Sequence, residues 1–169
     1  LKKLEEIQEC IFIRGNHDRY LLEKIWEDEL PTLEGMDPND PICKAIVKNE
    51  KWTADLLGLD GVKFCSKMKI AHREIIGQNL IEFSHAWYKR DDKPPSIKEG
   101  LEWRDHLEKL YPKIKNFVFI HGHVHFPRHQ VVENTYLSIN NDGSGGRIPN
   151  TVVKELEDRL DAEYVPFYI

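Results

Sequence analysis

Two histidines separated by one residue, His123 and His125, follow an apolar run, Phe117–Ile120, that is typical of a buried strand. In an extended segment, side chains at positions i and i+2 point to the same side, so both imidazoles would face one cleft. Imidazoles placed together at a strand end are suitable ligands for divalent transition metals. His121 occupies a position where an apolar residue is expected, and we interpret it as a structural residue and not a ligand. The segment therefore predicts a metal-binding site.

Two further polar clusters follow apolar runs. These are Asn16-His17-Asp18 after the run Cys10–Ile13, and His85 after the run Leu80–Phe83. In layered α/β folds, sites collect at the carboxyl ends of strands. We therefore expect the three clusters to contribute to one active site.

Apolar spacing and turn residues predict helices interleaved with strands, which is typical of an α/β layered fold. The expected helices are Arg19–Leu30, one or two short helices forming a cap or insert at about 32–60, and Ile97–Leu110. The expected strands are Cys10–Ile13, Val62–Ile70, Leu80–Phe83, Phe117–Ile120, Gln130–Glu133 and Tyr136–Asn140. Val62–Ile70 and Leu80–Phe83 would form a hairpin through the turn Gly77-Gln78-Asn79. For the last segment we favour a second hairpin, Thr151–Leu156 with Ala162–Tyr168, over a helix at Lys154–Ala162.

Composition narrows the class of protein. At 169 residues, one domain with one substantial core is the default expectation. A net charge of −5 gives no bulk attraction to nucleic acid or to anionic membranes, and no apolar run approaches a membrane span. We expect Cys10, Cys43 and Cys65 to be free thiols, with Cys10 and Cys65 buried. Free thiols favour a reducing, cytoplasmic setting.

The motifs, taken together, resemble the calcineurin-like metallophosphoesterases, in particular the small bacterial phosphodiesterase branch. Gly15-Asn16-His17-Asp18 is similar to the family's Gly-Asn-His-Asp/Glu block, and Gly122-His123-Val124-His125 is similar to its Gly-His-x-His block. Ser84-His85 is similar to its isolated metal-binding histidine. The segment 137–144 is similar to the family's Asn-Pro-Gly-Ser turn, with one extra residue and no proline. The resemblance extends from Leu4 onward.

The resemblance implies an α/β/β/α sandwich and a binuclear site that hydrolyses a phosphomonoester or phosphodiester by means of a metal-bridged hydroxide. Asn16, His85 and His123 would hold one divalent cation, and His125 would hold the other. His17 would act as the general acid that protonates the leaving alkoxide, and Asp18 would orient it. Imidazole and amide ligands suit Mn²⁺, Fe or Zn²⁺, of which we favour Mn²⁺.

Two motifs of the family have no counterpart here. Its Asp-x-His and Gly-Asp-x-x-Asp blocks precede the Gly-Asn-His-Asp block and supply the remaining ligands, including the carboxylate that bridges the metals. The residues before Gly15 contain neither Asp nor His. We therefore expect the chain to be the C-terminal part of a longer enzyme, to lack the first strands of its sheet, and to have weak activity or none by itself.

The alternative hypothesis is a non-catalytic protein-binding scaffold with a degenerate phosphoesterase fold, for which a retromer subunit is a family precedent. A third is a hydrolase with a single Zn²⁺. Within the enzyme hypothesis, the partner is a phosphate-ester substrate; a small phosphodiester, a nucleotide or nucleic acid, and a phosphoprotein all fit. The oligomeric state is not predicted.

Overall fold

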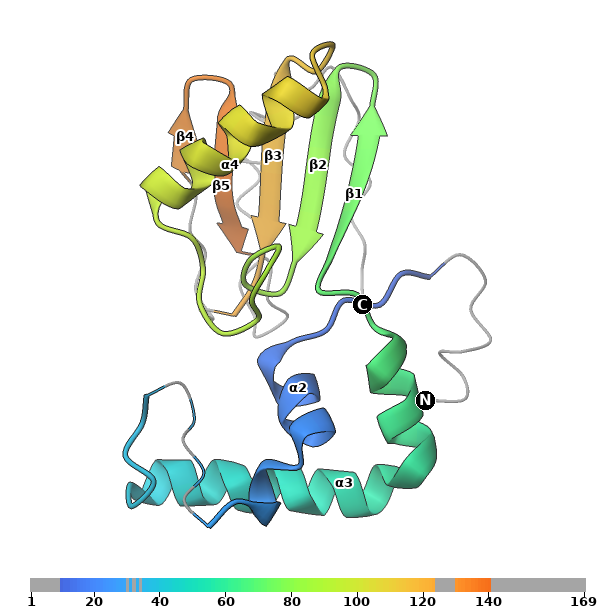
Figure 1. The fold of residues 1–169 in the computed structure, drawn as a ribbon, viewed down its shortest axis with the longest axis vertical. Helices are drawn as coiled ribbons and strands as arrows, with labels where there is room; N and C mark the ends of the chain where they lie inside the picture. The colour runs from blue at the N-terminus through green and yellow to red at the C-terminus, as the bar shows by residue number, and fades with distance from the viewer. Residues whose placement is uncertain (1–9, 30, 32, 34, 124–129, 141–169) are drawn as a thin grey trace. The chain divides into compact units, whose positions relative to one another are not determined.

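The computed structural model describes residues 10–29, 31, 33, 35–123 and 130–140. The chain divides into two compact units, Leu1–Ile70 and Ala71–Ile169 (Figure 1). Each unit is described by itself below. No helix within the described ranges is long and apolar enough to cross a membrane.

The first unit is helical. It contains α2 (Asn16–Glu23), the 3-10 helix η1 (Ile25–Glu27) and α3 (Pro41–Lys67). Helix α3 begins at a favourable cap, because the Asp40 carboxylate accepts a hydrogen bond from the Ile42 N–H at 2.7 Å and proline occupies the first helical position. Gly58, at φ 59° and ψ −163°, interrupts the helical backbone and divides α3 into two straight parts.

Two apolar clusters hold this unit together. One joins Tyr20 and Ile25 to Leu33 and Cys43, and the other joins Leu21 to Phe64 and Cys65. Both clusters therefore pack the short helices against the inner face of α3.

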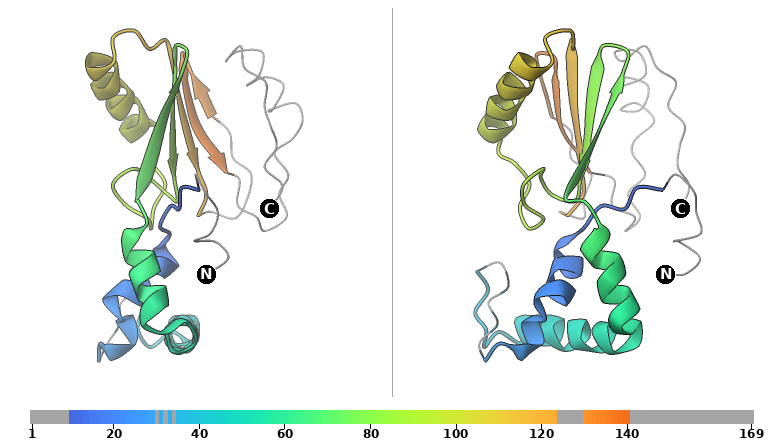
Figure 2. Two further views of the ribbon diagram at one scale, coloured as in Figure 1. Left: turned by 90° about the vertical axis from the view of Figure 1, so that its right-hand side faces the viewer. Right: turned by 45° about the vertical axis from the view of Figure 1, so that its right-hand side comes forward.

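The second unit is a mixed sheet with one helix. Its five strands lie in the order β1-β2-β3-β5-β4, where β1 is Ala71–Ile76, β2 Asn79–Ser84, β3 Asn116–His121, β4 Gln130–Val132 and β5 Thr135–Asn140. Strands β2, β3 and β5 are parallel, and β1 and β4 are antiparallel edge strands. Helix α4 (Ile97–Leu110) covers one face of the sheet (Figure 2). Its Leu107 packs there on Leu80 and Phe117.

A buried carboxylate lies within this apolar layer. Glu82 on β2 is 1% exposed, and its Oε2 accepts a hydrogen bond from Nε of the cross-strand Arg73 at 2.5 Å. The indole N–H of Trp103 on α4 donates to the same carboxylate, and the Arg73 guanidinium lies 5.0 Å from the centre of the Trp103 ring. Burial raises the pKa of Glu82, and the bonds from Arg73 and Trp103 oppose that rise.

The structure confirms the expected strands at 80–83, 117–120, 130–133 and 136–140, the helix at 97–110 and the turn after Ile76. The predicted strand Val62–Ile70 is wrong, because residues 62–67 continue α3 and the hairpin partner is β1. Alternating apolar residues there also match a helical stripe, along which Gly61, Phe64 and Cys65 are buried. The expected hairpin at 151–168 lies outside the described residues.

The region before α3 also differs from expectation. Cys10–Ile13 is no strand; a single bridge joins Ile13 to Lys69. Helix α2 begins at Asn16, not Arg19, and ends at Glu23 because Lys24 adopts a left-handed backbone with φ 52°. The one or two helices expected at 32–60 correspond to α3, which begins at Pro41, is interrupted at Gly58 and continues to Lys67. Cys10 is exposed, whereas Cys43 and Cys65 are buried free thiols.

A charged clasp holds the loop before α4. The Arg90 guanidinium donates to both oxygens of Glu99 at 2.8 and 3.2 Å and to the carbonyls of Lys93 and Pro94. Glu99 also accepts hydrogen bonds from the N–H and hydroxyl of Ser96, the N-cap of α4. The bond from Arg90, followed by that from Ser96, lowers the pKa of Glu99 from 4.5 to about 2.

Because of this charged clasp, we expect part of the free energy of unfolding to depend on pH in the acid range. Because the folded pKa of Glu99 is lowered, its contribution is present above pH 4.5 and is lost as pH falls from 4.5 towards about 2. Glu99→Gln should lower the free energy of unfolding by about 0.5–1 kcal/mol at pH 7, since the pair is partly exposed. Urea titrations at pH 7 and pH 3 should show the difference shrinking at pH 3. Glu102→Gln, on the same helix and 65% exposed, should show little change at either pH.

Candidate functional site

Two histidines meet at the carboxyl ends of adjacent parallel strands. β2 and β3 are in register up to Ser84 opposite His121, so His85 and His123 lie just beyond the paired residues. The Gly122 N–H donates to the His85 carbonyl at 2.7 Å and fixes the two loops to each other. Nδ1 of His123 lies 3.3 Å from Nε2 of His85, with the ring planes 78° apart.

The backbone of His123 is in an unusual conformation. Its φ is 75°, in the left-handed region that residues other than glycine seldom adopt. Such a conformation costs of order 1 kcal/mol and persists where the surroundings determine it, often at functional sites. Here it accompanies the placement of the His123 ring against His85.

The spacing of the two ring nitrogens is compatible with a shared cation. Two nitrogens bound to one tetrahedral metal, each at about 2.0–2.1 Å, lie about 3.3–3.4 Å apart. The same spacing also allows a hydrogen bond between one protonated and one unprotonated ring nitrogen. No group of three or more His, Cys, Asp or Glu residues positioned to hold a metal is found among the described residues. The pair therefore fits two ligands of a metal site and needs others to complete it.

The second predicted cluster lies in the first turn of α2. Asn16 is buried, whereas His17 is exposed. Nδ1 of His17 lies 2.5 Å from Oε1 of Glu50 on α3, a carboxylate whose side chain is 3% exposed. Glu50 therefore fixes the orientation of the His17 ring through Nδ1, and Nε2 is the ring nitrogen turned away from Glu50.

The expected partner of His17, Asp18, has different contacts. One oxygen of Asp18 accepts a hydrogen bond from the Gly15 N–H at 2.8 Å, and the other lies 3.8 Å from the Cys65 thiol. Burial, followed by the charge of Asp18, raises the pKa of Cys65 and keeps its thiol protonated. Asp18 thus stabilises the start of α2, and the carboxylate that contacts the His17 ring is Glu50.

Sequence reasoning missed Glu50, although a signal was present. Buried or half-buried positions recur along the inner face of α3 at Cys43, Val47, Ala54 and Leu57, and Glu50 is the charged residue within that stripe. A carboxylate placed on an otherwise apolar helix face predicts a polar partner. The assignment of residues 32–60 to short insert helices concealed this stripe.

The remaining predicted site residues are placed as follows. Asn16, His17 and Asp18 belong to the first unit, and His85 and His123 belong to the second. The structure defines contacts among residues of the same unit. His125 lies outside the described residues. His121 is 2% exposed within β3, which agrees with a structural role.

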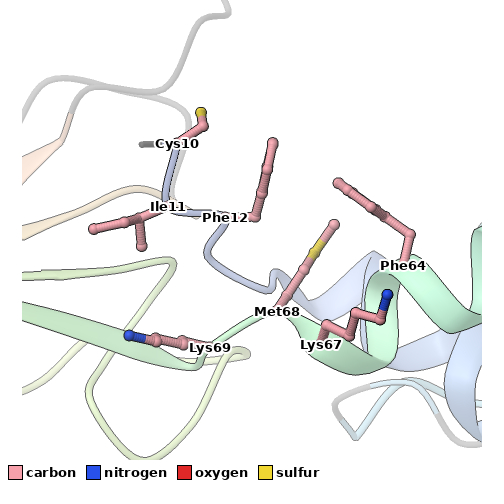
Figure 3. A pocket seen from close by; sticks show the side chains of 7 residues that line it. All are labelled: Cys10, Ile11, Phe12, Phe64, Lys67, Met68 and Lys69. Atoms are coloured by element: carbon pink, nitrogen blue, oxygen red, sulfur yellow. The ribbon is translucent and has the colours of Figure 1, made fainter. Parts of the chain in front are cut away.

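A separate pocket in the first unit has a volume of about 550 Å³. Figure 3 shows its lining side chains: Cys10, Ile11, Phe12, Phe64, Lys67, Met68 and Lys69. None of the predicted site residues lines it, so it does not bear on the two clusters described above.

Comparison with known proteins gives a likeness of fold. No protein-family model matches the chain, and no curated protein matches it. The fold resembles the crystal structure of hypothetical protein PH1004 from Pyrococcus horikoshii OT3. The match covers 95% of this chain and 70% of that protein, with a TM-score of 0.51 and 13% sequence identity. A likeness at this identity supports the mixed α/β fold class and says nothing of activity.

Proposed function

We propose that this chain carries metal ligands and the general acid of a metal-dependent phosphoesterase with an α/β/β/α sandwich of the metallophosphoesterase type. The observation that carries the proposal is the pair His85 and His123. Their ring nitrogens lie 3.3 Å apart at the carboxyl ends of neighbouring parallel strands, where such sites collect.

In this proposal, His85 and His123 bind one divalent cation together with Asn16, and His125 binds a second. Mn²⁺ is favoured, with Fe and Zn²⁺ as alternatives, because the ligands are imidazoles and an amide oxygen. When bound, a pair of such ions would polarise the phosphoryl oxygens and make a water molecule more acidic.

His17 supplies the proton for the leaving group. Its contact with the buried Glu50 at 2.5 Å holds the ring in one orientation. The proton on Nε2 then passes to the departing oxygen of the phosphate ester. Positioned acids of this kind contribute typically about 10²–10⁴-fold to a reaction rate.

The ligand set is incomplete without carboxylates. The bridging and terminal carboxylates of the resembling family have no counterpart among residues 1–14. The substrate is a phosphomonoester or a phosphodiester.

The test is hydrolysis of bis-p-nitrophenyl phosphate by the full-length gene product. We expect activity that increases with added Mn²⁺ and disappears with a chelator, at a metal content of two ions per chain. His106→Ala, which removes an exposed imidazole from α4, should leave that activity unchanged. One bound Zn²⁺ per chain would favour the mononuclear hydrolase, and chelator-resistant activity would contradict both metal mechanisms.

A non-catalytic protein-binding scaffold is the second candidate. Helix α3 favours it, because large apolar side chains on this helix are exposed: Ile42, Trp52, Leu56 and Leu59. Absence of both Mn²⁺ binding and hydrolysis in the full-length protein would select this candidate.

A further inference from the structure

Helix α3 carries an exposed stripe with the spacing of a coiled-coil seam. The positions alternate by three and four residues and are all exposed: Ile42, Ala45, Asn49, Trp52, Leu56 and Leu59. Ile42, Trp52 and Leu56 are 60% to 66% exposed. Positions that repeat in this way lie on one face of the helix. Mostly apolar residues at such positions are typical of a helix that pairs with another helix.

The opposite face of the same helix is already occupied. Cys43, Val47, Ala54 and Leu57 pack against the short helices of the first unit. The exposed stripe is therefore a second apolar face of α3, separate from the one that holds its own unit together. The break at Gly58 limits the straight part of this face to Pro41–Leu57.

The stripe has a hollow at one end and bulky side chains at the other. A groove of about 430 Å³ lies along its N-terminal half, lined by His17, Pro41, Ile42, Ala45, Ile46 and Asn49. Trp52 and Leu56 project from the C-terminal half. A second helix running in the opposite direction would place large side chains against small ones at each end.

We propose that α3 pairs with α3 of a second copy of this chain, antiparallel and about a two-fold axis between Asn49 and Trp52. The partner's Leu56 packs against Ala45, and the partner's Trp52 packs against Asn49. The symmetry repeats both contacts, so each groove receives the bulky side chains of the other copy. A parallel pair would instead stack Trp52 on Trp52 and Ala45 on Ala45, leaving unequal gaps.

The charges beside the stripe favour the same direction. Lys48 and Asp55 lie seven residues apart, at equivalent positions flanking the seam, and both are exposed. In the antiparallel pair, Lys48 of each copy lies beside the partner's Asp55, so opposite charges meet on both sides. Asp55 already accepts a hydrogen bond from Lys51 at 3.0 Å and can bind a second cation.

The length of the contact between the two helices limits the affinity of the dimer. Residues 41–57 span about 25 Å at 1.5 Å per residue, which is fewer than five helical turns. Such a contact buries less area than a standard stable interface, so we expect a weak dimer with a Kd of about 10 μM or more.

Sedimentation velocity of the 169-residue chain from about 5 to 500 μM tests this inference. The average mass should rise from that of a monomer towards that of a dimer. Leu56→Glu should keep the chain monomeric throughout, because it introduces a charge into both ends of the seam. Leu110→Glu replaces a leucine of similar exposure on α4 and should dimerise like the parent chain. Circular dichroism will establish that both variants are folded.

Charge exchange tests the direction of the pairing. Lys48→Glu should raise the dimer Kd at least about 5-fold, because it places two carboxylates together on each side. Adding Asp55→Lys to that variant should restore much of the affinity. A chain that stays monomeric at every concentration, or a dimer that Leu56→Glu leaves intact, would overturn the proposal. Failure of the charge exchange to restore affinity would overturn the antiparallel register.

Discussion

Replacing His123 with alanine is expected to lower Mn²⁺-stimulated hydrolysis of bis-p-nitrophenyl phosphate by the full-length protein at least about 100-fold. The change removes one of the two imidazoles whose nitrogens lie 3.3 Å apart. A cation that loses this ligand contributes less charge stabilisation in the transition state, and a deficit of about 2.7 kcal/mol corresponds to 100-fold in rate. The measurement is kcat/KM as a function of Mn²⁺ concentration.

The same variant must be compared with folded controls. His123 is half-buried just beyond β3, and the apolar core clusters formed by the described residues of the unit do not include it, so the melting temperature should change little. His85→Ala should reproduce the loss, because it removes the other imidazole of the pair. Undiminished activity in the His123 variant would remove this residue from the mechanism. Loss of activity together with loss of fold would require the metal affinity of His85→Ala to decide the role of the pair.

The second large effect is expected for stability. Arg73→Met should lower the free energy of unfolding by about 2–3 kcal/mol at pH 7, because it leaves the Glu82 carboxylate buried without its cation. Arg73 is itself 36% exposed, so water can replace part of its contribution and the expected loss lies below that of a fully buried pair. Urea unfolding measures the change, and Lys98→Met, from an exposed ion pair on α4, serves as the control.

The acid dependence of that variant provides an independent check. Burial raises the pKa of Glu82, and removing Arg73 removes the largest interaction that opposes this rise. A group with a raised folded pKa stabilises the fold at low pH and loses this contribution as pH increases. The defect of Arg73→Met should therefore be greatest at pH 7 and smaller at pH 4. Arg73→Met with Glu82→Leu should recover most of the loss, whereas an equal defect at both pH values would contradict this account.

The second unit followed its sequence pattern closely. The run 117–120 is continuous in apolar residues, and the run 80–83 is apolar except for Glu82, because parallel strands in the middle of a sheet are covered on both faces. Ser96 with Glu99 marks the start of α4 as a capping box, and both of its hydrogen bonds are present. Local signals and tertiary packing agree in these elements, so the sequence alone was sufficient to predict them.

The first unit was harder to predict because two periodicities coincide. From Val62 to Ile70, apolar residues alternate like a strand, but the buried positions Gly61, Phe64 and Cys65 follow a helix that packs on Leu21. Tertiary contact with α2 decides between the two patterns, and no local signal reports it. The same holds for the site, where sequence neighbours suggested Asp18 as the partner of His17. The observed partner, Glu50, is 33 residues away.

The left-handed backbone of His123 has a consequence for how this position can change. Glycine adopts that conformation without strain, so it is the residue that would best preserve the fold there. If thermal stability alone were optimised, glycine would replace His123 at this turn. The backbone conformation and the proposed metal site therefore favour different residues at this position.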